Sequence, residues 1–170
     1  MRTRNLLLGL SVAGIFLPGA EVRTSATSTD EQTIRALDDR YSAAVASKDV
    51  KTMMSIYAPS ERLVVFDAFL PRQYVGLAAV RKDYEDFFGA FPGPAKSAVS
   101  DLNITAAGAM AYAYGVDRWV VTAKDGTTTE LVFRFTDVPH KAKGRWLIVH
   151  EHISFPVDPA TGTADYLSKS

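Results

Sequence analysis

The chain contains no cysteine among its 170 residues. Disulfides, a thiol nucleophile, a lipid anchor on an N-terminal cysteine and cysteine-ligated zinc are therefore excluded. The chain also has no excess of either charge, because 19 Lys and Arg residues balance 19 Asp and Glu residues. No basic run or stripe is present, so nucleic acid is not an expected partner.

Several motifs of well-known enzymes are missing as well. The sequence has no Gly-rich phosphate loop, no GxSxG motif and no HExxH motif, which argues against nucleotide binding and the common hydrolase mechanisms. Apolar residues make up 47% of the chain and charged residues 22%, as in an ordinary globular domain. The length suits one domain with a sizeable core.

The N-terminus differs in pattern from the rest of the chain. Arg2 and Arg4 precede an apolar run over residues 6–17, which small residues such as Ala20 and Ala26 follow. This is the layout of a secretory signal peptide, and the run is shorter than the roughly 20 apolar residues that span a bilayer. We therefore expect residues 1–26 to be a signal peptide cleaved near residues 20–26. The mature protein would be periplasmic or secreted, with no membrane partner.

Hydrophobic periodicity divides the mature chain into helices and then strands. Helical spacing predicts helices near residues 30–47, 53–57 and 77–91, whereas residues 63–69 are strand-like. Beyond a Pro-Gly-Pro cluster the period becomes two, which predicts strands at 99–106, 109–123, 127–138 and 145–155, with turns at 124–126 and 140–144. The order predicts an α+β domain over residues 27–158, with helices on one face of a curved antiparallel sheet. Residues 159–170 are expected to form a C-terminal tail.

Asp67 is an acidic residue in a strongly apolar stretch. It lies in the strand-like segment 63–69, beside Phe66 and close to Val65 and Phe69. An ionised carboxylate in such surroundings costs several kcal/mol unless a partner compensates it. Asp67 is therefore a candidate for chemistry, and the alternative is a structural carboxylate paired with Arg72.

The last predicted strand holds a second acid, Glu151. By alternation it shares one face with Leu147, Val149, Ile153 and Phe155. Desolvation on an apolar face would raise its pKa, as a general acid or base requires. The alternative is a Glu at a surface edge or in a salt bridge.

The opposite face of the same strand would carry Trp146, His150 and His152. Two imidazoles at this spacing are compatible with a metal ion, but the sequence names no third ligand, so no metal site is expected. We interpret the histidines as structural residues, or as part of a subunit interface or alternative polar site with Trp146 and Arg134. On the preceding strand, Phe133 and Phe135 share an apolar face that suits either the core or an apolar ligand.

Three segments together resemble the nuclear-transport-factor-2-like superfamily, which includes SnoaL-like cyclases and ketosteroid isomerases. They are the first helix from Tyr41 to Asp49, the segment VVFDAFLPRQYVG, and the closing GRWLIVHEHIS. The closing segment is also similar to the end of the calcium/calmodulin-dependent kinase II association domain, an oligomerisation hub. The resemblance spans about residues 30–157. It implies a cone of three N-terminal helices packed on a strongly curved antiparallel sheet that encloses a pocket.

The resemblance also implies roles for single residues. In ketosteroid isomerases a tyrosine lies eight residues before the aspartate that closes the first helix, and a catalytic aspartate lies nine residues before a glycine. Tyr41 and Asp67 have these spacings from Asp49 and Gly76, which implies an oxyanion donor and a proton-shuttling base. The second, protonated aspartate of those isomerases corresponds to Leu131 here. Glu151 is the candidate substitute for this missing donor.

We therefore expect an exported SnoaL-like domain that binds a small, largely apolar molecule in a cone pocket. Whether it also catalyses cofactor-independent proton transfer, of the isomerase, cyclase or hydratase type, is left open by the sequence. The alternative is a non-catalytic ligand-binding or oligomerisation module, and a homodimer is expected in either case. The expected catalytic residues are Asp67, Tyr41 and Glu151, and the expected pocket walls are Tyr84, Phe88, Tyr112, Tyr114, Phe133 and Phe135.

Overall fold

The computed structural model describes residues 28–167, so the expected signal peptide and its cleavage site lie outside the described residues. In chain order the elements are α1 (Ser28–Ser47), α2 (Val50–Met54), β1 (Val64–Phe66), β2 (Tyr74–Val75), α3 (Leu77–Ala90), β3 (Ala95–Ala107), β4 (Met110–Thr122), β5 (Thr128–Ala142) and β6 (Arg145–Ser154). Among the described residues, no helix is long and apolar enough to cross a membrane.

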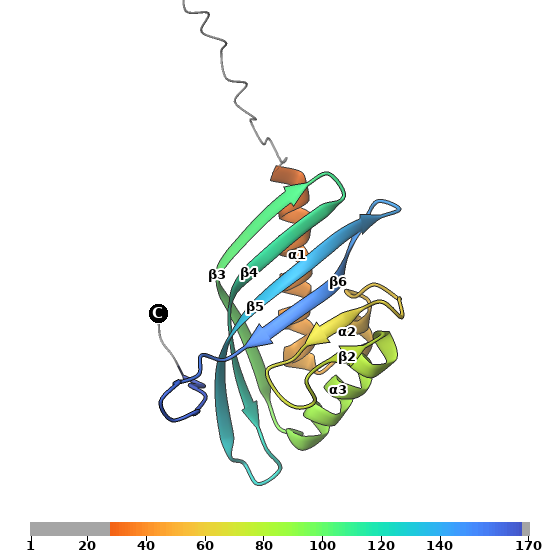
Figure 1. Cartoon of the computed structure of the whole chain (residues 1–170). Helices are drawn as coiled ribbons and strands as arrows, with labels where there is room; N and C mark the ends of the chain where they lie inside the picture. Colours follow the sequence, from red (N-terminus) through yellow and green to blue (C-terminus); the bar gives the residue numbers. More distant parts are fainter. Residues whose placement is uncertain (1–27, 168–170) are drawn as a thin grey trace, which may run out of the picture.

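The six strands form one sheet in the order β2-β1-β6-β5-β4-β3. Figure 1 shows that the long strands bend, with α1 running along the sheet and α2 and α3 beside its β1 and β2 end. Strands β3 to β6 form an antiparallel meander. The α+β prediction is therefore confirmed. The parallel pairing of β1 with β6 was not predicted. The two strands are far apart in sequence, and local patterns do not show which distant strands pair.

Strand β1 is shorter than the sequence predicts. It ends at Phe66, so Asp67 begins the loop that leads to β2 rather than lying inside a strand. Gly76 then caps α3 with a positive φ of 81°, a conformation that L side chains rarely adopt. A Cβ atom on Gly76 would also lie 3.0 Å from a carboxylate oxygen of Glu61. Both constraints explain why glycine stands where α3 begins.

The second predicted turn is tighter than expected. Strand β5 continues to Ala142, and only Lys143 and Gly144 separate it from β6. Both residues have positive φ values of 51° and 77°, as a two-residue hairpin turn requires. The predicted turn at residues 140–144 is therefore present but shorter, because residues 140–142 belong to β5.

A β-bulge changes which residues of β6 face the core. Val138 pairs with His150, but the next residue, Pro139, pairs with Ile148. Val149 is thus the extra residue of the bulge, and the alternation of faces shifts by one at this point. The predicted faces of β6 are therefore wrong before the bulge.

Trp146 lies on the core side as a result of this shift. It is 3% exposed, and its indole N–H donates to Oδ1 of Asp30 at 3.1 Å. Glu151, beyond the bulge, also faces the core and is 4% exposed. Trp146 is therefore a core residue that ties the start of α1 to the sheet, and it does not share a face with His150.

Candidate functional site

Three neighbouring cavities share lining residues and decrease in volume from the first to the third. The first, here called the outer basin, has a volume of about 800 Å³. Its walls include Asp67, Asp83 and Phe87, and the C-terminal residues Tyr166 and Leu167 also line it. The backbone N–H of Val132 in β5 donates to the carbonyl of Tyr166 at 2.7 Å. The segment expected to be a tail thus supplies part of the basin wall.

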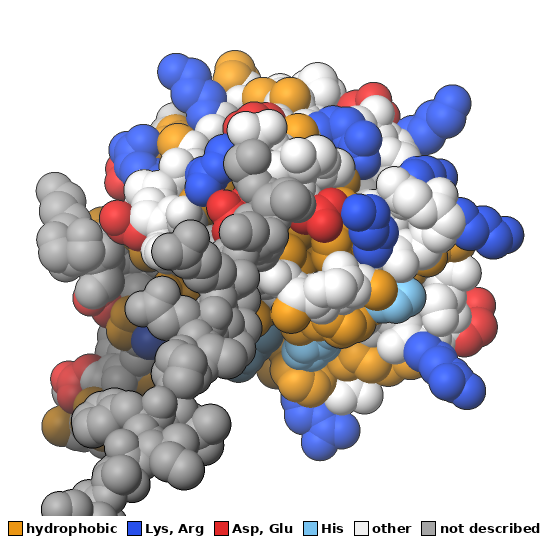
Figure 2. All heavy atoms as spheres, turned by 90° about the horizontal axis from the view of Figure 1, so that it is seen from above, with side chains coloured by type: hydrophobic (Ala, Val, Ile, Leu, Met, Phe, Trp, Pro, Cys, Tyr) orange, Lys and Arg blue, Asp and Glu red, His pale blue; other side chains and the backbone are white. Residues whose placement is uncertain are grey.

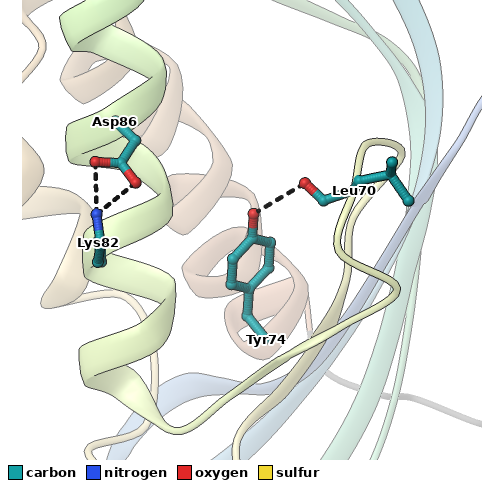
Figure 3. A network of polar contacts seen from close by, with 4 residues as sticks. All are labelled: Leu70, Tyr74, Lys82 and Asp86. Carbon is teal, nitrogen blue, oxygen red and sulfur yellow. Dashed lines mark hydrogen bonds and ion pairs between the residues drawn. The ribbon is translucent and has the colours of Figure 1, made fainter.

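The polar groups at the basin's helical wall are already engaged with one another. Figure 3 shows Tyr74 between α3 and the loop after β1, with its hydroxyl directed at the carbonyl of Leu70 at 3.5 Å. Tyr74 also hydrogen-bonds Asp83, and burial is the largest cause that raises its pKa. On α3, Lys82 pairs with Asp86 at 2.6 Å. Asp67 and Asp83 line both this basin and the next cavity inward.

The second cavity, the middle chamber, has a volume of about 40 Å³ and contains both residues that the resemblance singled out. Tyr41 and Asp67 line it together with Tyr84, Trp119 and Phe133. Asp67 also lines the outer basin. Asp67 and the phenol of the first helix therefore line the same chamber.

Asp67 has a perturbed acidity in this position. Burial raises its pKa to about 6, and the neighbouring charge of Asp83 adds to the rise. The backbone N–H of Ala68 donates to its Oδ1 at 2.6 Å and acts in the opposite direction. The described residues give Asp67 no ion pair with Arg72. A carboxylate with this pKa can both accept and return a proton near neutral pH.

A chain of phenols leads from the middle chamber toward Glu151. The hydroxyl of Tyr41 lies 2.9 Å from that of Tyr84, which lies 2.9 Å from that of Tyr57. Tyr57 donates to Oε2 of Glu151 at 2.7 Å. Burial raises the pKa of all three phenols well above the usual range, so they remain protonated at neutral pH.

The third cavity, the inner chamber, has a volume of about 20 Å³ and is lined by four carboxyl groups. They are Asp38 (9% exposed), Asp117 (2%), Asp137 (5%) and Glu151 (4%). No Lys, Arg or His is among the described residues that line it. Burial without a cation favours the protonated form of a carboxyl group, and burial is the largest cause that raises the pKa of each of these four acids.

The four acids differ in the number of hydrogen bonds that their carboxyl oxygens make. Asp117 accepts hydrogen bonds from the indole N–H of Trp119 at 2.7 Å and from the hydroxyl of Ser97 at 3.0 Å. Within the described residues, Oδ2 of Asp38 and Oδ1 of Asp137 have no hydrogen-bond partner. Burial, followed by the charge of Asp39, raises the pKa of Asp38 to about 7.

Asp137 and Glu151 form a pair across two strands. They lie opposite each other in the β5–β6 register and share a hydrogen bond. Burial raises the pKa of Asp137 well above its usual range and that of Glu151 to about 7. Two adjacent buried carboxyl groups cannot both ionise cheaply, so the pair holds at least one proton at neutral pH.

The fold brings some of the expected wall residues to the chambers and places others elsewhere. Phe133 lines the middle and inner chambers, and Phe135 lines the inner one. Phe88 instead packs in the core, with its ring stacked on Trp119 at 6.3 Å. A Cβ atom on Gly115 would lie within 3.2 Å of the Phe135 ring, so glycine at this position makes room for that wall.

Tyr112 and Tyr114 do not line any of these cavities. They are 48% and 46% exposed, and their rings stack on each other at 6.3 Å on the outer face of β4. The inward positions of β4 belong to small residues such as Ala111 and Ala113. The expected role of both tyrosines as pocket walls is therefore not supported by their position.

The two histidines of β6 also lie on the outer face. The ring of Phe66 contacts His150 at 5.1 Å and His152 at 5.7 Å, and Nδ1 of His150 lies 2.8 Å from the carbonyl of Val64. Arg134 is exposed and donates to the carbonyl of Phe155 at 3.4 Å. Figure 2 shows histidine side chains beside apolar ones, with Lys and Arg around the edge. In the part of the chain that the structure describes, no group of three or more His, Asp or Glu is placed to hold a metal ion.

Sequence reasoning missed three of the acids and one phenol, although a signal existed for each acid. Asp137 continues the alternation of Phe133 and Phe135 by one step along β5. Asp38 lies one helical turn after Ile34, on the buried face of α1. The remaining two, Asp117 and Tyr57, occupy buried positions in otherwise apolar patterns.

The helices packed on a curved sheet form the α+β cone of NTF2-like proteins. Residues 34–158 match the family model of the SnoaL-like domain, and the chain belongs to this family. The comparison with curated proteins gives no match.

Solved structures of the same fold come from several bacteria. An NTF2-like protein of unknown function from Pseudomonas putida KT2440 has 29% identity and a TM-score of 0.76, with 85% of this chain and 99% of that chain covered. A proposed calcium/calmodulin-dependent protein kinase II association domain from Xanthomonas campestris has 24% identity and a TM-score of 0.63, with 71% and 84% covered. A proposed dehydratase of the NTF2-like family from Streptomyces avermitilis has 15% identity and a TM-score of 0.66, with 74% and 95% covered.

Proposed function

We propose that this SnoaL-like domain binds a small, largely apolar molecule in the outer basin and middle chamber and transfers a proton next to a carbonyl group. The reaction would be of the isomerase, cyclase or hydratase type and would need no cofactor. Asp67 is the base, Tyr41 contacts the carbonyl oxygen, and Glu151 is a second acid or base that acts through the phenol chain.

The position of Asp67 carries this proposal. It lies where the wide basin meets the narrow middle chamber, so a ligand in the basin can reach it. Its pKa of about 6 lies near the pH at which a general base works best. The apolar walls, including Phe87 and Leu131, suit the body of an apolar ligand.

The test uses cyclohexanone as a probe ketone and follows exchange of its α-protons for deuterium by proton NMR. The wild-type protein should accelerate exchange over buffer, and Asp67→Asn should lower the protein-dependent rate by about 100-fold or more. Asp39→Asn is the matched control, because Asp39 is exposed on α1 and should leave the rate unchanged. Equal rates in the wild type and Asp67→Asn would remove Asp67 from the mechanism.

A second candidate function is assembly of two copies through the outer face of the sheet. Tyr114, Thr136, His152 and Phe66 follow one another in register across β4, β5, β6 and β1. Phe66 is 37% exposed and Tyr114 46%, and exposed aromatic groups of this kind favour an interface. Sedimentation of the wild type and of Tyr114→Asp would test this, since the charge should shift a dimer toward monomers.

Export is proposed on the sequence of residues 1–26 alone. Arg2, Arg4 and the apolar run that follows support a cleaved leader. Intact mass measurement of the protein recovered from separated cell fractions would test it. A full-length chain confined to the cytoplasmic fraction would contradict export.

A further inference from the structure

The phenol chain has a direction that follows from counting its protons. Each phenol carries one hydroxyl proton and can donate only once. Because Tyr57 donates to Glu151, its oxygen must accept from Tyr84, whose oxygen in turn must accept from Tyr41. In this state Tyr41 has no proton left for a ligand and offers only an acceptor to the middle chamber.

A proton on Glu151 reverses this direction. With Oε2 protonated, Glu151 donates to Tyr57, Tyr57 donates to Tyr84, and Tyr84 donates to Tyr41. Each hydroxyl only rotates, and no bond to a heavy atom other than the added O–H on Glu151 changes. The proton of Tyr41 then points to whatever lies in the middle chamber.

Asp137 decides how easily Glu151 gains this proton. The two carboxyl groups share a hydrogen bond, and the described residues supply no cation to the inner chamber. Oδ1 of Asp137 accepts no hydrogen bond from the described residues although the residue is only 5% exposed, so nothing at this oxygen stabilises the ionised form and Asp137 keeps its proton. The pair therefore alternates between one and two protons rather than between none and one.

We propose that the proton count of the Asp137–Glu151 pair selects the class of ligand that the middle chamber binds. With one proton on the pair, Tyr41 accepts and the chamber favours a hydroxyl or N–H group. With two protons, Tyr41 donates and the chamber favours a carbonyl or enolate oxygen. The ligand part of this inference rests on the proposed function, whereas the reversal of the chain does not.

Other titratable groups surround the chain but are not joined to it by hydrogen bonds. They are Asp38 on α1, Asp67 after β1, Asp83 on α3 and Asp117 on β4. Their titration can alter the electric field at Tyr41, but it cannot reverse the order of donors in the chain. An experiment must therefore separate the two effects.

Carbon-13 NMR of tyrosine Cζ and carboxyl carbons from pH 5 to 9 makes this separation. The Asp67→Asn/Asp83→Asn background removes both titrating acids that line the middle chamber with Tyr41. The Tyr41 Cζ shift should then follow the titration of Glu151 with a common midpoint. In the added variant Tyr57→Phe, Glu151 should still titrate while the Tyr41 transition disappears.

Two further variants serve as a control and as a replacement for Tyr57→Phe. Tyr112→Phe, on the outer face, is the matched control and should leave the Tyr41 transition unchanged. If Tyr57→Phe fails to fold, Glu151→Gln replaces it and should also abolish the transition. The proposal is overturned if the Tyr41 Cζ shift does not change with the titration of Glu151. It is also overturned if the Tyr41 transition persists in Tyr57→Phe or Glu151→Gln.

Ligand selection is tested with cyclohexanone and cyclohexanol, which share a ring and differ at the oxygen. Calorimetric titration should show the ratio of their affinities moving toward the ketone by about tenfold between pH 8 and pH 5.5. Binding of both with a constant ratio overturns the selection and leaves the proposed function standing. Absence of binding by both, with a normal NMR result, counts against the proposed function and against the selection that rests on it.

Discussion

Tyr57 and Glu151 are 94 residues apart in sequence, yet the hydroxyl of Tyr57 donates a 2.7 Å hydrogen bond to the buried carboxyl group. This contact joins the segment after α2 to the last strand and lies at the end of the phenol chain. Hydrogen bonds to a charged group are stronger than those between neutral groups. The contact therefore favours the ionised form of a group whose burial favours the protonated form.

Removing this hydroxyl should have two measurable effects. Tyr57→Phe should raise the pKa of Glu151 further, because the hydrogen bond from Tyr57 lowers it in the wild type. It should also lower the free energy of unfolding by about 1–3 kcal/mol, since a buried acceptor loses its donor. Carboxyl NMR titration and urea unfolding measure the two quantities. Tyr112→Phe should change stability by less than about 0.5 kcal/mol, and equal effects of both substitutions would contradict the assigned contact.

Stability should fall as the pH rises from about 4 to above 7. Asp38, Asp67 and Glu151 have raised pKa values of about 7, 6 and 7, so the folded protein keeps protons that the unfolded chain has already released. Each group's contribution to the free energy of unfolding is complete below its pKa in the unfolded chain. This contribution is lost as the pH rises past its pKa in the folded protein. Urea unfolding between pH 4.5 and 8.5 measures this, and rising stability over that range would contradict the burial of these acids.

The contribution of Asp38 can be isolated with a neighbour as control. Asp38→Asn should raise the free energy of unfolding at pH 8 by about 1–3 kcal/mol, because it removes a buried charge. At pH 4.5 the gain should shrink, since the wild-type carboxyl group is then protonated. Asp39→Asn, at the adjacent exposed position, keeps the buried carboxyl group, so it should give a smaller gain at pH 8, through loss of the charge that adds to the rise in the pKa of Asp38, and little change at pH 4.5. A gain of the same size at both pH values would show that charge is not the cause.

Any exchange activity should have a narrow, bell-shaped dependence on pH. Asp67 must be ionised to accept a proton, so the rate should rise as the pH passes about 6. The Asp137–Glu151 pair must keep two protons for Tyr41 to donate, so the rate should fall as the pH passes about 7. Rates of cyclohexanone exchange from pH 5 to 9 measure this profile. A rate that keeps rising above pH 8 would contradict donation by Tyr41.

Much of the architecture follows from patterns local to the sequence. Helical spacing up to residue 47, a Pro-Gly-Pro break and period-two segments predict the helices and the meander, because each depends on neighbouring residues. The apolar stretch around Asp67 marked it as a candidate, and the family resemblance added Tyr41. Periodicity did not predict the β5–β6 bulge. One extra residue, Val149, shifts the alternation of faces by one and places Trp146 in the core.

By itself, the sequence determined the α+β class, the absence of cysteine chemistry and, with the family resemblance, the candidates Tyr41, Asp67 and Glu151. The tertiary structure alone decided that Asp137 would face Glu151 and that Tyr84 and Tyr57 would link Tyr41 to this pair. These contacts join five chain segments that are distant in sequence, and their proton sharing depends on distances of about 3 Å and on exclusion of water. Local residue patterns carry no information on either quantity, because only the packed sheet and helices create them.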